Sequence, residues 1–329
     1  MQNILVTGGA GYIGSHACKA LSKAGYRPIA YDNLSFGHEW AVKWGPLERG
    51  DILDRQRLDE VLKQYQPAAV MHFAAFTYVG ESVTDPGKYY RNNVAGSLAL
   101  LEAMRDCSVG TIIFSSTCAT YGIPESVPIA EDAPQRPINP YGAAKLMVER
   151  MIQDFAAAHG LKFALLRYFN ASGADPDNQI GEDHNPETHL IPLALDAAAG
   201  RRPSLTVFGS DYDTPDGTCI RDYIHVTDLA AAHICALEAL TKGGRPSAAY
   251  NLGNGLGASV NDVIETTQRV TGLSVPVVRG ERRPGDPAVL ITNSTKAHEE
   301  LGWVPRITDL GEIIATAWAW HQRQWPSGR

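Results

Sequence analysis

The glycine-rich segment at residues 7–14 constrains the fold of this chain more than any other feature, because it directly follows a short apolar run. The run is Ile4-Leu5-Val6, and the segment reads Thr7-Gly8-Gly9-Ala10-Gly11-Tyr12-Ile13-Gly14. Its spaced glycines permit a tight turn after a strand, a close approach of the backbone to a phosphate, and close packing of the next helix. A helix N-terminus also favours negative charge. The segment therefore predicts a phosphate-binding loop between a first strand and a first helix.

Short apolar runs alternate with stretches of helical spacing through the first half of the chain. The apolar runs predict strands at residues 4–6, 28–31, 69–73, 111–114 and 163–168, and the spacing predicts helices at 14–24, 57–65, 94–101 and 147–155. Strands and helices that alternate in this way form a parallel sheet covered on both faces. We expect an α/β fold with a Rossmann-like, doubly wound parallel sheet.

The alternation loosens after about residue 170, where Pro, Gly and Asp become frequent. We expect a nucleotide-binding domain at residues 1–170 and a smaller C-terminal α/β domain at 171–329. The run Tyr250-Asn251-Leu252-Gly253 has the composition of a late strand. Part of the second half, at about residues 220–255, is therefore expected to return to the first domain.

Asp32 lies at the end of the second predicted strand. A carboxylate at this position accepts hydrogen bonds from an adenosine ribose and repels a 2′-phosphate, so it favours NAD over NADP. Asp51 and Ile52, after Gly50, are expected to border the adenine in a similar way. The alternative for Asp32 is a turn residue before Asn33.

A second motif is Tyr141-Gly142-Ala143-Ala144-Lys145, in which the first and last residues lie on one face of a helix. An ammonium near a phenol lowers the pKa of the phenol, which can then remove a proton from a substrate hydroxyl. Asn139-Pro140 precedes the motif and places Tyr141 at the start of the helix. Ser115, Ser116 and Thr117 follow a predicted strand, where ligands of open α/β sheets bind. The alternatives are a solvated lysine beside a packing tyrosine, and a turn-forming hydroxyl cluster.

Composition excludes several other classes of protein. The 329 residues carry a net charge of −7, which gives no general attraction to nucleic acid. A membrane-spanning apolar run and a secretory signal are not expected. The five scattered cysteines form no C-x-x-C motif and the ten histidines form no H-E-x-x-H motif. We expect a cytoplasmic protein without disulfides and without a metal site.

Several later segments occur together, in order, in one known family. They are Ser116-Thr117-Cys118-Ala119-Thr120-Tyr121-Gly122, Leu166-Arg167-Tyr168-Phe169-Asn170, Phe208-Gly209-Ser210-Asp211-Tyr212, Asp216-Gly217-Thr218, Arg221-Asp222-Tyr223-Ile224-His225-Val226, Tyr250-Asn251-Leu252-Gly253 and Arg282-Arg283-Pro284-Gly285-Asp286. With the two motifs above, they resemble the UDP-glucose 4-epimerase family of the extended short-chain dehydrogenase/reductase superfamily. The first segment resembles bacterial members that supply exopolysaccharide synthesis.

The resemblance implies a reaction in which C4 of UDP-glucose or UDP-galactose is oxidised, the 4-keto sugar rotates, and the hydride returns to its other face. Tyr141 would be the base, Lys145 its electrostatic partner, and Thr117 a hydroxyl donor. Lys145 and Tyr141 would also contact NAD, together with Gly8, Gly11, Tyr12, Ile13, Gly14, Asp32, Asn33, Asp51, Ile52, Phe73, Ala74, Ala75, Asn92, Ser115, Tyr168 and Phe169. The UDP-sugar would contact Thr117, Tyr141, Asn170, Leu190, Phe208, Arg221, Arg283 and Asp286. A homodimer through residues 94–104 and 147–155 is also implied.

Two departures from the family pattern, at Thr77 and His189, leave the roles of these positions open. A 4,6-dehydratase of the same superfamily would carry Asp-Glu where this chain has Cys118-Ala119. Epimerisation of UDP-xylose and UDP-arabinose stays open. So does epimerisation of UDP-N-acetylglucosamine, because Leu290 is intermediate in size at the position that limits the sugar pocket. The non-enzymatic alternative is a dinucleotide-sensing protein, which would need the glycine loop but not Thr117, Tyr141 and Lys145 together.

Overall fold

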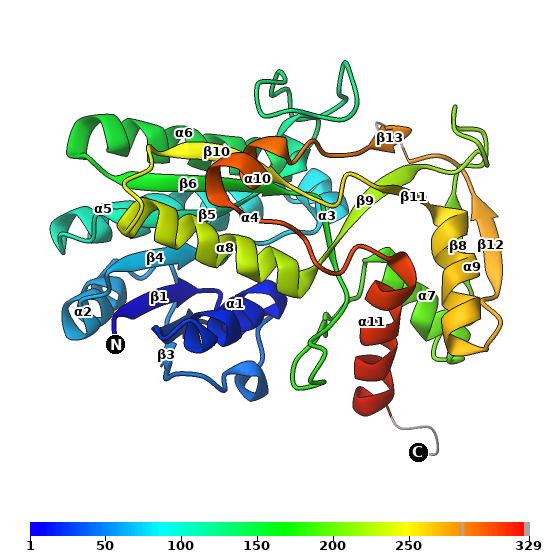
Figure 1. Ribbon diagram of the computed structural model, residues 1–329, viewed down its shortest axis with the longest axis horizontal. Helices are drawn as coiled ribbons and strands as arrows, with labels where there is room; N and C mark the ends of the chain where they lie inside the picture. The colour runs from blue at the N-terminus through cyan, green and yellow to red at the C-terminus, as the bar shows by residue number, and fades with distance from the viewer. Residues whose placement is uncertain (284–285, 326–329) are drawn as a thin grey trace.

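A parallel sheet of seven strands forms the larger part of the computed structural model, which describes residues 1–283 and 286–325 (Figure 1). The strands lie in the order β10-β6-β5-β4-β1-β2-β3. Their bounds are β1 (Asn3–Thr7), β2 (Arg27–Asp32), β3 (Leu47–Arg49), β4 (Ala69–His72), β5 (Thr111–Thr117), β6 (Lys162–Tyr168) and β10 (Ala248–Leu252). This order reverses between β1 and β4, as in dinucleotide-binding sheets. The predicted Rossmann-like α/β fold is confirmed.

Helices cover both faces of the large sheet, and the strands are apolar on both faces for that reason. Along β1, Ile4 and Val6 pack into one core and Leu5 into the other, because successive side chains of a strand alternate. One face is covered by α1 (Tyr12–Lys23), α8 (Val226–Thr241) and α10 (Thr295–Leu301). The other is covered by α2 (Arg55–Tyr65), α5 (Gly96–Asp106) and α6 (Pro140–His159).

The connection between β4 and α5 is helical over most of its length. It contains α3 (Val79–Thr84), α4 (Pro86–Tyr89) and the wide turn η2 (Tyr90–Ala95). Two further single-turn segments are η1 (Glu39–Ala41), which follows β2, and η3 (Cys118–Thr120), which follows β5. β5 ends at Thr117, so the observed strand is longer than the strand predicted at 111–114.

The remaining elements form a smaller part at one end of the large sheet (Figure 1). β7 (Asn170–Ser172), β9 (Ile220–His225), β11 (Gly257–Ser259) and β13 (Val289–Leu290) pair with one another, and β8 (Leu205–Phe208) pairs with β12 (Val277–Gly280). The accompanying helices are α7 (Leu190–Ala198), α9 (Val260–Thr271) and α11 (Leu310–Gln324). They bury their own apolar clusters, which include Ile191, Val263 and Ile313.

The chain passes between the two parts several times. After β9, α8 packs against α1, and β10 pairs in parallel with β6 at the edge of the large sheet. Later, α10 and Trp303 return to the same core. The division near residue 170 stays a prediction, but these contacts show that the fold is not divided at a single point in the sequence.

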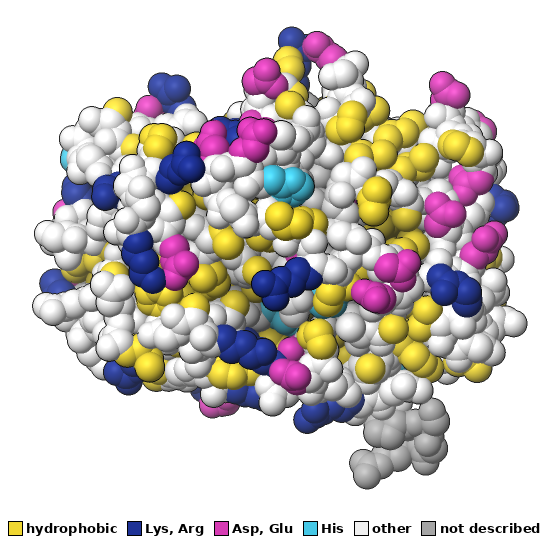
Figure 2. All heavy atoms as spheres, in the orientation of Figure 1, with side chains coloured by type: hydrophobic (Ala, Val, Ile, Leu, Met, Phe, Trp, Pro, Cys, Tyr) yellow, Lys and Arg dark blue, Asp and Glu magenta, His cyan; other side chains and the backbone are white. Residues whose placement is uncertain are grey.

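Among the described residues, none of the helices has the length and hydropathy needed to cross a membrane. On the face drawn in Figure 2, acidic and basic side chains are interspersed instead of gathered into one basic patch. Charged groups therefore offer no extended basic surface on this face.

Candidate active site

A cavity of about 1460 Å³ lies along the carboxyl ends of the large sheet and extends to the smaller part of the chain. Parallel α/β sheets bind ligands at this edge. Of the predicted site residues, those that line the cavity are Gly8, Gly11, Tyr12, Ile13, Gly14, Asp32, Asn33, Ile52, Phe73, Ala74, Ala75, Asn92, Ser115, Thr117, Tyr141, Lys145, Tyr168, Phe169, Asn170, Leu190, Phe208, Arg221, Arg283 and Asp286. Asp51 is the predicted site residue outside this lining. Its carboxylate instead accepts a hydrogen bond from Asn33 at 2.8 Å.

The glycine loop turns tightly at the point where β1 meets β4. Gly8 has a positive φ of 73°, and a Cβ there would lie 2.7 Å from the backbone nitrogen of Ala74. A Cβ on Gly14 would lie 2.1 Å from the Gly8 carbonyl oxygen. Gly11 occupies the N-cap of α1 and has no side chain to cap the first N–H groups. The loop thus leaves helix N–H groups facing the cavity, which suits the pyrophosphate of a dinucleotide.

Asp32 ends β2 and is held by two backbone hydrogen bonds. Its two carboxylate oxygens accept from the amides of Ala10, at 3.0 Å, and Leu34, at 2.8 Å. Burial raises the pKa of Asp32, and the two hydrogen bonds lower it in part. A rigid carboxylate beside the glycine loop fits the ribose of NAD and disfavours a 2′-phosphate.

Two elements, β5 and α6, bring Thr117, Tyr141 and Lys145 to the same cavity. Thr117 is the last residue of β5, and Tyr141 lies in the first turn of α6. The side chain of Asn139 caps that helix by accepting from the amide of Gly142 at 2.8 Å, so the sequence signal for the helix start is confirmed. Lys145 follows one turn later, and its Nζ donates to the carbonyl oxygen of Ser115 at 2.7 Å.

Burial dominates the electrostatics of the tyrosine and the lysine. It raises the pKa of Tyr141 well above the ordinary value, and a hydrogen bond with Thr117 lowers it in part. Burial also lowers the pKa of Lys145 to about 7, against the opposing effect of Glu149. Burial thus opposes the expected lowering of the Tyr141 pKa, which the positive charges of Lys145 and of bound NAD⁺ would promote. The lysine ammonium is directed to the Ser115 carbonyl and lies 4.9 Å from the Phe114 ring centroid.

A buried ion pair beneath these residues was not predicted from the sequence. Arg167 on β6 and Glu149 on α6 are each almost fully buried, and their side chains meet at 2.6 Å. Ser116 donates to the same carboxylate, and Arg167 also donates to the Tyr121 hydroxyl at 3.0 Å. The pair fixes α6 against β5 and β6. A glutamate eight residues after the tyrosine and four after Lys145, on the same helix face as both, was the available signal.

The far end of the cavity contains the residues predicted for the UDP-sugar. Arg221 on β9 pairs with Asp286 at 2.5 Å, and the Arg283 guanidinium lies 4.1 Å from the Phe208 ring centroid. Asn170 donates to the Asp222 carbonyl at 3.0 Å. Leu190 begins α7, and Pro284 and Gly285 lie outside the described residues. Two cationic planar groups, one of them over an aromatic ring, suit a diphosphate joined to a base.

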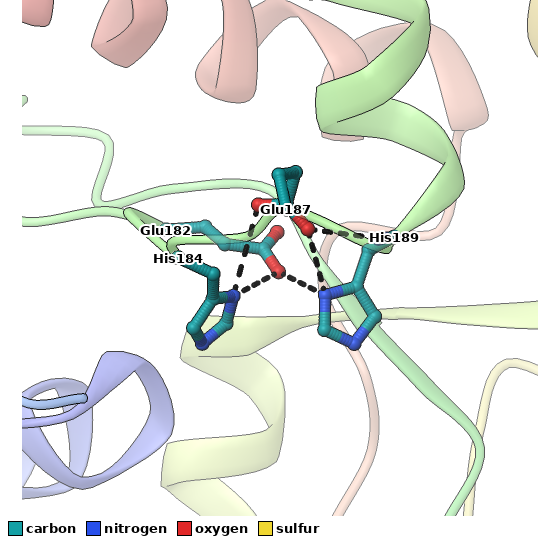
Figure 3. Close-up of side chains that lie close together, drawn as sticks. All are labelled: Glu182, His184, Glu187 and His189. Carbon is teal, nitrogen blue, oxygen red and sulfur yellow. Dashed lines mark hydrogen bonds and ion pairs between the residues drawn. The ribbon is translucent and has the colours of Figure 1, made fainter. Parts of the chain in front are cut away.

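Other residues of the cavity were left open or missed. Thr77, His189 and Leu290 line it, as do Cys118 and Ala119. Glu182, His184 and Glu187 also line it and converge with His189 on one point (Figure 3). The spacing E-x-H-x-x-E-x-H was the signal that could have identified this group. Arg282, in contrast, pairs at 2.6 Å with the exposed Asp211.

Comparison of the sequence with known proteins shows that the chain has close relatives. Residues 4–253 match the NAD dependent epimerase/dehydratase family. A protein of Rhizobium meliloti named UDP-glucose 4-epimerase is 54% identical over 323 residues, which cover 98% of each chain.

Solved structures agree with the sequence comparison. The crystal structure of UDP-glucose 4-epimerase from Brucella ovis in complex with NAD matches with a TM-score of 0.95 and 56% identity, over 97% of this chain and 98% of that one. UDP-glucose 4-epimerase from Bifidobacterium longum, in complex with NAD⁺ and UDP, matches with a TM-score of 0.94 and 37% identity over 100% of both chains.

Proposed function

The chain belongs to the NAD dependent epimerase/dehydratase family, and from this premise we propose that it is an isomerase that interconverts UDP-glucose and UDP-galactose at C4. The observation that carries the proposal is that one cavity contains three groups of residues. These are the glycine loop with Asp32, the group Thr117, Tyr141 and Lys145, and the pair Arg221 and Arg283. The names of the relatives support the same activity.

We assign the acid–base work of the reaction to Tyr141. As the phenolate, Tyr141 takes the proton from the C4 hydroxyl, and as the resulting phenol it returns that proton when the configuration has inverted. Thr117, at the end of β5, holds the substrate hydroxyl, and Lys145 supplies positive charge beside the site. NAD, when bound by the glycine loop and Asp32, supplies the acceptor and donor of the C4 hydride.

The sugar must present each of its two faces to the cofactor in turn, so the substrate must be bound tightly through its other part, the nucleotide. We assign binding of the diphosphate to Arg221 and Arg283 and contact with the base to Phe208, because all three line the cavity and Arg283 lies over the Phe208 ring. Asn170, Leu190 and Asp286 complete this end. We further propose that residues 1–170 bind the cofactor and 171–329 the substrate, with about 220–255 belonging to the first part.

Dehydration at C5 and C6 is disfavoured by the same cavity. Where a dehydratase would present Asp-Glu, the lining residues are Cys118 and Ala119, and neither is a carboxylic acid. Leu290 also lines the cavity, so it is placed to affect the size of the sugar that the site accepts.

The proposal is tested by a panel of UDP-glucose, UDP-galactose, their N-acetyl forms and UDP-xylose, incubated with the purified protein without added NAD. We expect UDP-glucose and UDP-galactose to interconvert, as measured by sugar analysis of the products. A protein that contains NAD but converts no UDP-hexose or UDP-pentose would instead be a dinucleotide sensor.

We also propose that the protein acts as a cytoplasmic homodimer joined through α5 and α6. Leu98 on α5 and Met147 on α6 are large apolar residues with 38% and 47% exposure, and the two helices are in contact. Light scattering coupled to size-exclusion chromatography should give twice the mass of one chain for the wild type and the mass of one chain for Met147→Glu. A monomeric wild type would contradict the dimer. The free cysteines Cys18, Cys107, Cys118, Cys219 and Cys235 suit a reducing compartment.

A further inference from the structure

The group Glu182, His184, Glu187 and His189, named here the His/Glu cluster, has no role in the proposed reaction. The four residues lie on one loop between β7 and α7. Their ligand-type atoms, one from each residue, all lie within 4.8 Å of one another. Figure 3 shows both imidazole rings and both carboxylates directed toward a common centre.

The distances within the His/Glu cluster are those of a shared centre instead of two separate ion pairs. Nδ1 of His189 lies 2.7 Å from Glu182 and 3.1 Å from Glu187. Nδ1 of His184 lies 3.1 Å from Glu182 and 3.7 Å from Glu187. Each nitrogen thus faces both carboxylates. Ligands of a tetrahedral zinc ion with bonds of about 2.0–2.1 Å are separated by about 3.3 Å, which lies within the range of these distances.

We propose that the His/Glu cluster binds one divalent transition-metal ion of the zinc type. Imidazole nitrogen and carboxylate oxygen are both zinc ligands. The two carboxylates neutralise the charge of a divalent ion, and the two neutral imidazoles complete the set of four ligands. Because all four positions are supplied by the protein, the ion is structural and leaves no open position for a substrate.

The surroundings of the cluster meet the other requirements of a metal site. Glu187 is oriented by the amides of Thr188 and His189, at 2.6 and 2.8 Å. The loop is anchored by Tyr78, which donates to the Pro186 carbonyl at 2.7 Å. A second cavity of about 400 Å³ is also lined by Glu182, His184 and Glu187, which line the large cavity as well. An ion therefore has access to the centre.

The position of the cluster indicates what the ion does. His189 is the N-cap of α7, which begins with the predicted substrate contact Leu190. The His184 ring packs edge-on against Tyr12 of the glycine loop and against Tyr78, with centroids 6.2 and 6.4 Å away. An ion at this centre fixes the start of α7 relative to the nucleotide loop.

The test uses the purified full chain, dialysed first against a chelator and then against metal-free buffer. Calorimetric titration with Zn²⁺ should show one ion per chain, and Zn²⁺ should raise the melting temperature. Co²⁺ in its place should give the visible d–d absorption of a four-coordinate ion without thiolate charge-transfer bands, because the ligands are nitrogen and oxygen.

Variants separate this site from adventitious binding. His184→Asn and Glu182→Gln should each weaken Zn²⁺ binding at least 100-fold and abolish the melting-temperature shift. His321→Asn is the matched control, since His321 pairs with Asp196 at 2.9 Å in the wall of the same second cavity. It should bind Zn²⁺ like the wild type.

Three results would overturn the proposal. They are less than one-tenth of an equivalent of Zn²⁺ bound by the wild type, binding that survives in folded His184→Asn and Glu182→Gln, and thiolate bands in the Co²⁺ spectrum. The Co²⁺ spectrum is recorded on the wild type, so it tests the proposal even if the two variants do not fold. Epimerase activity is not part of this test, so its outcome is independent of the proposed function.

Discussion

At the scale of single residues, burial determines the properties of the groups in the cavity. It raises the pKa of Tyr141 and Asp32 and lowers the pKa of Lys145 to about 7. Charge on any of these groups is therefore costly unless an opposite charge or a hydrogen-bond donor lies beside it. Asp32 has two backbone donors beside it, and Lys145 has the Ser115 carbonyl.

The cofactor preference depends on the charge of Asp32. We expect Asp32→Asn to weaken NAD binding by about tenfold, since a hydrogen bond to a charged group contributes about 1.4 kcal/mol or more. The variant should also bind NADP more tightly than the wild type, because the repulsion of the 2′-phosphate is removed. Fluorescence titration with both nucleotides measures the change.

Asp59→Asn provides the control for this prediction, because Asp59 lies on α2 outside the cavity lining and pairs with Arg55 at 2.9 Å. It should change NAD binding by less than twofold. A loss of NAD affinity as large in Asp59→Asn as in Asp32→Asn would show that the carboxylate of Asp32 has no special role.

Wherever a motif linked a predicted site residue to a strand end or a helix start, that residue lines the cavity. Gly8, Asp32, Thr117 and Tyr141 are of this kind. Sequence reasoning could not show that Arg221 meets Asp286, because 65 residues separate them. It also missed the His/Glu cluster, because a loop and not a regular element brings those side chains together.

At the scale of elements, α6 is the helix on which the site depends. It carries Tyr141 and Lys145 at one end and is fixed to β6 by the Glu149–Arg167 ion pair. Glu149→Gln should destabilise the protein by about 3–5 kcal/mol, because it leaves Arg167 buried without its counter-charge. The free energy of unfolding in urea measures this cost.

The exposed pair Arg150–Asp154 of the same helix is the matched control, with side chains 73% and 57% exposed. Asp154→Asn should cost less than about 0.5 kcal/mol, as exposed helical ion pairs do. The double variant Glu149→Gln/Arg167→Met should recover part of the lost stability. Equal costs for Glu149→Gln and Asp154→Asn would mean that the buried pair does not fix α6.

Most elements of the first half were predictable because they have a local signal, such as the apolar run of β1 or the spacing of α2. The short elements β3, α3 and α4 were not predicted. In the second half only the late strand was predicted, and it overlaps β10. α8, α9 and α11 occur among Pro- and Gly-rich segments, and the short strands β11 and β13 exist only through pairing with β9. Such pairing is non-local, so no short window of sequence contains it.

At the scale of the whole molecule, buried neutral histidines predict sensitivity to acid. Burial lowers the pKa of His16, His225 and His233 to about 4 and that of His72 to about 3. Between these values and about 6.5 the unfolded chain binds more protons than the folded one. Stability is therefore lost as the pH falls through this window, by at most about 1.4 kcal/mol per pH unit for each histidine.

Urea unfolding at several pH values between 6.5 and 4.5 measures this slope. We expect His233→Leu to reduce it by about 1.4 kcal/mol per pH unit, because the ring of His233 is fully buried. His159→Gln, at an exposed position near the end of α6, should leave the slope unchanged. An unchanged slope in His233→Leu would contradict the account.

The account as a whole rests on Tyr141 as the base in a cavity that binds both NAD and a UDP-sugar. The most direct test is turnover of UDP-galactose by the wild type and by Tyr141→Phe, with the NAD content measured in the same samples. We predict that the variant retains the fold and its NAD but loses at least about 100-fold in turnover, the typical contribution of a general base. Near-native turnover of UDP-galactose by NAD-loaded Tyr141→Phe would contradict the central claim.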